Sequence, residues 1–191
     1  MPVSTQGEVR MAEKQTVKIT VKNHIARVQL NRPEALNAIN WMLIRQMNTL
    51  MDTLKSEDNV WVVYFEGSGK KAFSVGADLK ERKDMPTTDV LQLRGDMITL
   101  FRKITEFPKP TIAAVHGYAL GGGFELSLAC DIIIADETTV FGLTETSLGI
   151  IPGAGGTQAL PKRIGISRAK ELIFTAKRIN AREAERLGIP N

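Results

Sequence analysis

The first regular pattern in the chain consists of two short stretches in which apolar and polar residues alternate. Residues 16–21 read TVKITV and residues 25–30 read IARVQL. A period of two places successive side chains on opposite faces, as in a strand with one buried face. Only KNH lies between the two stretches. The pattern therefore predicts a β-hairpin.

A helical period follows the loop NRPEALNAIN, residues 31–40. From about residue 41 to residue 55, apolar side chains recur at intervals of three and four, which places them on one face of a helix. The residues of this face are Leu43, Met47, Leu50, Met51 and Leu54. Further helices are predicted over about residues 88–107, 122–129, 167–176 and 181–188.

Three continuous apolar runs alternate with these helices. They are VWVVYFEG at 60–67, TIAAVHG at 111–117 and DIIIAD at 131–136. Short apolar runs bounded by loops predict buried strands. Residues 67–84 are expected to form a loop that turns into a short helix near Ala77, and residues 140–165 to be mostly loop with one late helix. Strands that alternate with helices predict an α/β fold.

The composition is that of an ordinary globular protein, with 191 residues, 43% hydrophobic and 24% charged. We expect a flexible tail over residues 1–15 and one core domain over residues 16–191. The net charge is +4, but the basic residues are scattered, which favours a small anionic ligand over a nucleic-acid surface. The single cysteine, Cys130, allows no intrachain disulfide. No apolar run is long enough for a membrane span and no secretory signal is visible, so we expect a cytoplasmic location.

Candidate chemistry first appears in the stretch GYALGGGFELSLACD, residues 117–131. The glycine triplet at 121–123 follows a predicted strand and opens a predicted helix, where unpaired backbone N–H groups bind negative charge. Tight packing of the helix on a strand is the alternative explanation of the triplet. Glu125 lies among apolar residues, where a charge is costly unless it is paired or neutralised. The stretch is therefore a candidate oxyanion site with a carboxylate beside it.

Two other segments supply matching groups. Glu145 lies in the glycine-rich stretch FGLTETSLGIIPG, and Ala77 lies in AFSVGADLK, where the chain is expected to turn into a helix. Two N–H groups, on Ala77 and Gly122, would bind one oxygen from two sides, and two carboxylates nearby would form an acid–base pair. A surface position for Glu145 is the simpler alternative. The stretch GSGKK is interpreted as a solvated turn, because its glycine spacing does not match a phosphate-binding loop.

Five motifs in order resemble those of the enoyl-CoA hydratase/isomerase family, the crotonase superfamily. They are NRPEALNAI, FSVGADLKE, IAAVHGYALGGGFELSLACDI, FGLTETSLGIIPGAGGTQ and LPKRIGISRAKELIFTA. Among family members, GADLKER and AKELIF look most like the methylglutaconyl-CoA hydratase branch. The resemblance implies a crotonase-like fold of stacked β-sheets flanked by helices. It also implies that the C-terminal helical subdomain is truncated, because family members usually continue beyond this point.

The resemblance implies a reaction and a set of site residues. The reaction is the reversible addition of water to a 2-trans-enoyl-CoA, with Glu125 as base, Glu145 as acid and an oxyanion hole formed by Ala77 and Gly122. The coenzyme A part of the substrate would be bound by Ala35, Leu36, Ala77, Asp78, Leu79, Lys80 and Gly122. No metal and no further cofactor are expected. Retention of both glutamates favours a hydratase over the isomerases, which usually keep only the later carboxylate.

Other functions of the same family stay open. One relative binds RNA through a helix rich in lysine, but residues 41–55 offer only Arg45 and Lys55, so nucleic acid is an unexpected partner. The expected truncation would impair activity, and the homotrimer or hexamer of the family is expected only with its C-terminal helices. By resemblance, the pathway would be fatty acid and lipid metabolism.

Overall fold

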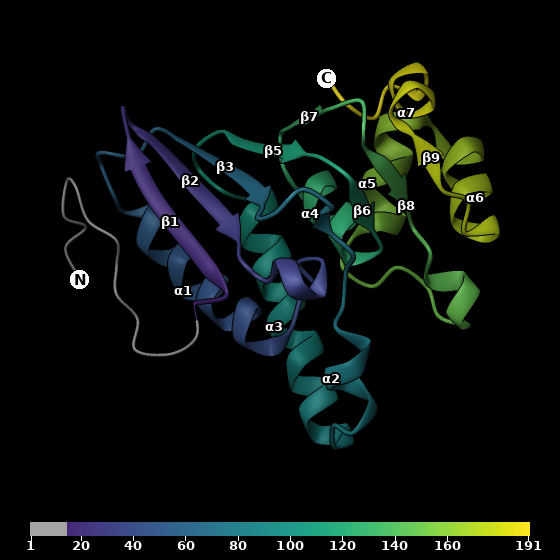
Figure 1. The fold of residues 1–191 in the computed structure, drawn as a ribbon, viewed down its shortest axis with the longest axis horizontal. Coiled ribbons are helices and arrows are strands. Elements are labelled where there is room, and N and C mark those ends of the chain that lie inside the picture. The colour runs from purple at the N-terminus through teal and green to yellow at the C-terminus, as the bar shows by residue number, and fades with distance from the viewer. Residues whose placement is uncertain (1–14) are drawn as a thin grey trace.

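The structure is a computed structural model, and it describes residues 15–191. The predicted tail at residues 1–15 therefore lies almost entirely outside the described residues. The chain forms two sheets with helices around them (Figure 1). Among residues 15–191, no helix is both long and apolar enough to cross a membrane.

The first sheet has five strands in the order β1-β2-β3-β5-β7. The predicted hairpin is confirmed, since β1 (Val17–Lys22) and β2 (Ile25–Leu30) pair antiparallel. Its turn residues, Asn23 and His24, have φ values of 50° and 64°, as the tight turn of a two-residue hairpin requires. The three predicted buried strands are β3 (Val62–Gly67), β5 (Thr111–Val115) and β7 (Ile132–Ala135), which all run parallel to β2.

Two long helices pack against one face of this sheet (Figure 1). The helix α1 (Trp41–Lys55) has the predicted bounds, and it begins where the Asn40 side chain accepts a hydrogen bond from the Leu43 N–H at 3.0 Å. Its predicted apolar face is buried, except that Leu50 is only partly buried. The helix α3 (Thr87–Thr105) ends two residues before the predicted end.

The second sheet has four short strands in the order β4-β6-β8-β9. They are β4 (Ala72–Ser74), β6 (Tyr118–Leu120), β8 (Val140–Gly142) and β9 (Ile179–Asn180). The pattern predicts a loop with a short helix near Ala77 at 67–84 and mostly loop with a late helix at 140–165. The two helices are confirmed as α2 (Leu79–Lys83) and α5 (Gly156–Ile164), but the strands β4 and β8 were not predicted. Strands of two or three residues are too short to show a period of two, so their pairing depends on the tertiary fold.

The helix α4 (Gly122–Ala129) contacts both sheets, and its residues 123–128 are all buried. The turn-rich segments carry α2 (Leu79–Lys83) and two 3-10 helices, η1 (Pro33–Ala35) and η2 (Glu145–Leu148). The chain then forms α5 (Gly156–Ile164), α6 (Ile166–Thr175) and α7 (Ala181–Leu187) beside the second sheet (Figure 1). The predicted α/β fold of stacked sheets flanked by helices is thus present.

Candidate active site

The three glycines at the start of α4 occupy positions with different structural requirements. Gly121 is the residue before the helix, with φ of 50°, a conformation that is strained for other residues. A β-carbon on Gly123 would lie 2.1 Å from the carbonyl oxygen of Ser74, so only glycine lets β4 approach the helix this closely. The packing explanation therefore holds for Gly123. Gly122 lies between these two, as the first residue of the helix.

The N–H groups of Ala77 and Gly122 lie on facing segments. Ile39 pairs with the chain on both sides of Ala77, since its N–H donates to the Gly76 carbonyl at 2.7 Å and its carbonyl accepts from the Asp78 N–H at 3.0 Å. Successive peptide groups of an extended chain point to opposite sides, so the Ala77 N–H points away from Ile39. A β-carbon on Gly122 would lie 3.8 Å from the Ala77 nitrogen. The Gly122 N–H has no acceptor within its own helix.

Glu125 is buried, with 3% of its surface exposed. Its Oε1 accepts hydrogen bonds from the backbone N–H groups of Ala154 and Gly156, both at 2.8 Å. Burial raises the pKa of Glu125 above its usual value, and the two backbone donors oppose that rise because they stabilise the charged form. These two donors could not be predicted from the sequence. The sequence signal for these donors is limited to the glycine-rich stretch GAGG at 153–156, because nearly every residue type has a backbone N–H and none marks a donor.

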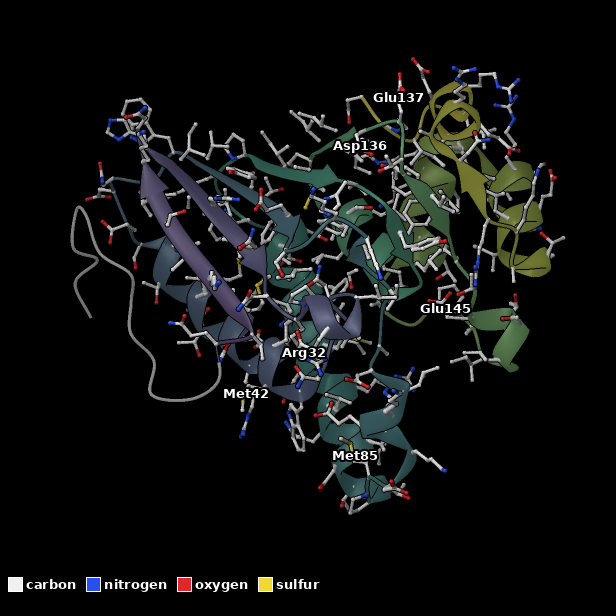
Figure 2. The ribbon with its side chains drawn as sticks, viewed as in Figure 1. Arg32, Met42, Met85, Asp136, Glu137 and Glu145 are labelled. Carbon is white, nitrogen blue, oxygen red and sulfur yellow. The ribbon has the colours of Figure 1, made fainter. Side chains whose placement is uncertain are left out.

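Glu145 stands at the start of η2, beyond the end of β8 (Figure 2). Its carboxylate faces the glycine triplet, since a β-carbon on Gly121 would come within 3.2 Å of Oε1. Its Oε2 is buried and has no hydrogen-bond partner among the described residues. Burial raises the pKa of Glu145 to about 7. A hydrogen bond from its own backbone N–H opposes this rise, and the charge of Glu125 adds to it. The structure therefore brings the two predicted carboxylates together, with different environments.

The raised pKa of Glu145 predicts a pH-dependent stability. The folded protein holds this proton up to a pH of about 7, whereas in the unfolded chain the pKa has its ordinary value of 4.5, so the stability that the proton adds is lost as the pH rises through this window. A pKa unit corresponds to about 1.4 kcal/mol, and solvent contact of this half-buried group limits the effect to at most ~3 kcal/mol. Glu145→Gln should lack this loss. Urea unfolding of both proteins at pH 5 and pH 8 measures it, and an equal change in both would contradict the raised pKa.

The residues predicted to bind coenzyme A lie around the Ala77 segment. Leu36 ends η1, and its carbonyl accepts from the Val75 N–H at 3.2 Å. Leu79 is 53% exposed, and Lys80 is also exposed. Asp78 has partners within the protein, because it begins α2 and forms an ion pair with Arg32. The predicted binding residues are thus close together, but Asp78 is already engaged.

A pocket of about 240 Å³ opens beside these residues. It is lined by Pro33, Leu36, Asn37, Ser68, Gly69, Lys70, Lys71 and Ala72. The two lysines belong to GSGKK, which is predicted to be a solvated turn, and this turn borders the pocket. Residues 15–191 hold no group of three His, Cys, Asp or Glu side chains arranged for a metal ion.

The structure gathers the carboxylates of Glu125 and Glu145 near the start of α4, where Gly122 faces the segment that carries Ala77. The chain belongs to the enoyl-CoA hydratase/isomerase family, whose family model matches residues 20–191. The predicted resemblance to that family is confirmed.

Known relatives agree with this assignment. The chain is 41% identical over 179 residues to a short-chain-enoyl-CoA hydratase of Clostridium acetobutylicum. This alignment covers 94% of this chain and 69% of that protein. It is 42% identical over 189 residues to the mouse protein named enoyl-CoA hydratase domain-containing protein 2, mitochondrial, covering 98% of this chain and 64% of the relative. Against the crystal structure of an enoyl-CoA hydratase from Bacillus anthracis, the TM-score is 0.90 with 45% identity, over 92% of this chain and 69% of that one. The chain thus spans roughly two thirds of the length of these relatives. The likeness to the methylglutaconyl-CoA hydratase branch stays a prediction.

Proposed function

We propose that the protein catalyses the reversible addition of water to a 2-trans-enoyl-CoA thioester. The observation that carries this proposal is the pair Glu125 and Glu145, which share one site but differ in their hydrogen bonds. Glu125 accepts from two backbone N–H groups, which favours its charged form, while Glu145 has a buried oxygen without a partner among the described residues. Environments that differ in this way suit a base and an acid in one reaction.

The proposed mechanism starts with the substrate carbonyl. The N–H groups of Ala77 and Gly122 would donate hydrogen bonds to the thioester oxygen and stabilise the negative charge that develops on it. Glu125 would accept a proton from a water molecule as the water oxygen bonds to C3. The electron pair of the double bond then forms an enolate, and Glu145 gives a proton to C2 as the carbonyl is restored. Both carboxylates would contact the same water, so their protonation would be a property of the pair.

The binding of coenzyme A is proposed from the resemblance to the enoyl-CoA hydratase/isomerase family. Leu79 and Lys80 at the start of α2, Ala77 and Gly122 at the oxyanion hole, and the η1 residues would contact it, with no metal and no separate cofactor. A homotrimer or hexamer and a cytoplasmic location are also proposed, although the mouse relative is named as mitochondrial. RNA is not a proposed partner. In α1, Arg45 lies over the Trp41 ring at 5.4 Å, and the helix presents too few basic residues for a phosphate backbone.

The assay must separate a hydratase from an isomerase, the main alternative. Crotonyl-CoA and longer 2-enoyl-CoA thioesters are incubated with the protein in water enriched in ¹⁸O, and products are analysed by mass spectrometry. We expect a 3-hydroxyacyl product with one ¹⁸O atom, because hydration takes its oxygen from water. A 3-enoyl product without ¹⁸O would identify an isomerase. Absence of turnover with every thioester would contradict the proposal.

A further inference from the structure

A partly buried ion pair lies directly beside the proposed oxyanion hole. Arg32 stands in the turn after β2 and before η1 (Figure 2). Its Nη1 is 2.9 Å from Oδ2 of Asp78, and only 14% of each side chain is exposed. The same Nη1 donates to the Ala38 carbonyl at 2.7 Å. Arg32 therefore joins the two segments that meet next to Ala77.

Asp78 uses both of its carboxylate oxygens within the protein. While Oδ2 faces Arg32, Oδ1 accepts from the N–H groups of Lys80 and Glu81 at 3.2 and 3.3 Å, which makes Asp78 the residue that caps α2. Burial acts to raise the pKa of Asp78, but hydrogen bonds from Arg32 and from the two backbone groups lower it below its usual value. The residue after Ala77 is therefore held as a charged group.

The second partner of Arg32, the Ala38 carbonyl, connects it to the segment that pairs with Ala77. Ala38 precedes Ile39, and the backbone of Ile39 bonds to the peptide groups before and after Ala77. Arg32 thus fixes both chains of this short parallel bridge, one through a carbonyl and one through the Asp78 side chain. The direction of the Ala77 N–H depends on that bridge, because an extended chain alternates its peptide groups.

We infer that Arg32 and Asp78 are positioning residues, whose ion pair aims the Ala77 N–H at the thioester oxygen. This inference rests on the proposed function. It gives Asp78 a role other than the contact with coenzyme A that the family resemblance implies. Coenzyme A carries anionic phosphates, and a carboxylate that is charged and engaged on both oxygens is a poor group to receive them. The two roles predict different kinetic results.

Asp78→Asn is the sharpest variant, since asparagine still caps a helix but removes the charge that holds Arg32. We expect kcat to fall by roughly 10- to 100-fold with KM changed by less than about 3-fold, because a misplaced donor weakens the transition state more than the bound substrate. Arg32→Met should behave alike, and Arg32→Lys should recover part of the loss. A raised KM with unchanged kcat would instead show contact with coenzyme A and overturn the inference. Unchanged kinetics in both variants would overturn it as well.

The matched control is Glu183→Gln, which removes a surface ion pair of 2.7 Å between Lys177 and Glu183, the latter in the first turn of α7. It should leave kcat and KM as in the wild type. Thermal unfolding of all variants is measured beside the kinetics. Should Asp78→Asn fail to fold, Arg32→Lys keeps the test valid, because it retains the charge and changes only the geometry; wild-type kcat in this folded variant would overturn the inference.

A spectroscopic measurement that needs no turnover can test the positioning role and the proposed oxyanion hole separately. Butyryl-CoA labelled with ¹³C at the thioester carbonyl cannot be hydrated, and infrared difference spectra report the hydrogen bonds to its oxygen. We expect a lowered stretching frequency on the wild-type protein and a smaller shift on Asp78→Asn. No shift on the wild type would contradict the proposed oxyanion hole itself. An equal shift on both proteins would contradict the positioning role alone.

Discussion

Replacement of Glu125 by glutamine should lower the rate of enoyl-CoA hydration by about 10²–10⁴, the range typical of a lost general base. Glutamine has nearly the same shape, and its amide oxygen can accept from the N–H groups of Ala154 and Gly156 as the carboxylate does. The fold should therefore be kept, while the group that takes the proton from water is lost. Stopped-flow measurement of the enoyl thioester absorbance gives the rate, and circular dichroism gives the fold.

The matched control for this variant is Glu137→Gln, because Glu137 is an exposed glutamate in the turn between β7 and β8 (Figure 2). It should hydrate its substrate at the wild-type rate. If Glu125→Gln keeps more than about a tenth of the wild-type rate, the assignment of the base is wrong.

Gly122→Ala should lower kcat strongly without loss of stability. The new β-carbon would lie 3.5 Å or more from all neighbours, which is ordinary contact, and alanine favours a helix more than glycine does. However, the methyl group would enter the gap between Gly122 and Ala77, where the thioester oxygen is expected. The N–H of residue 122 would remain, but the methyl group would keep the thioester oxygen from reaching it. Loss of one hydrogen bond to the oxyanion typically lowers kcat by about 10²–10³, and we expect a loss of that size here. Wild-type kinetics in this variant would contradict the placement of the hole.

Gly123→Ala is the companion variant, one residue further along α4, and its expected effect is the opposite. Here the β-carbon would overlap the Ser74 carbonyl oxygen, so β4 and α4 must separate. We expect a loss of stability of roughly 1–3 kcal/mol, as for other overpacked cores. Chemical denaturation of the two variants side by side measures the contrast, and similar stabilities would show that the triplet acts as a unit.

Much of the fold could be predicted from the hydrophobic pattern, and the reason is visible in α1. This helix has one continuous buried face, so three- and four-residue spacing marks its length to within a residue. The second sheet shows the limit. Its strands of two or three residues, such as Ile179–Asn180, are held by neighbours that are distant in sequence, and no local period reports such pairing.

The residues of the candidate site likewise differ in how far they could be predicted from the sequence. Glu125 could be found because a carboxylate among apolar residues is costly and so needs a reason. Glu145 and Ala77 required the family motifs, since each is an ordinary loop residue in isolation. The backbone donors to Glu125 and the ion pair of Arg32 with Asp78 could not be found from the sequence. They depend on contacts between segments that are 29 to 46 residues apart, such as the bond from the Ala154 N–H to Glu125.

The separate origins of the two carboxylates bear on how new reactions arise. The proposed base Glu125 and the proposed donor Gly122 lie within one turn of α4, whereas Glu145 lies in η2, a short segment joined to α6 by the bond from Thr146 Oγ1 to the Ile173 carbonyl. On the proposed mechanism, the base and one oxyanion donor would thus be encoded in one stretch of the chain and the group that protonates C2 in another. Substitutions in η2 would then be expected to change the fate of the enolate while α4 stays unchanged. In directed evolution, a library confined to residues 144–151 would explore new products at little risk to the fold.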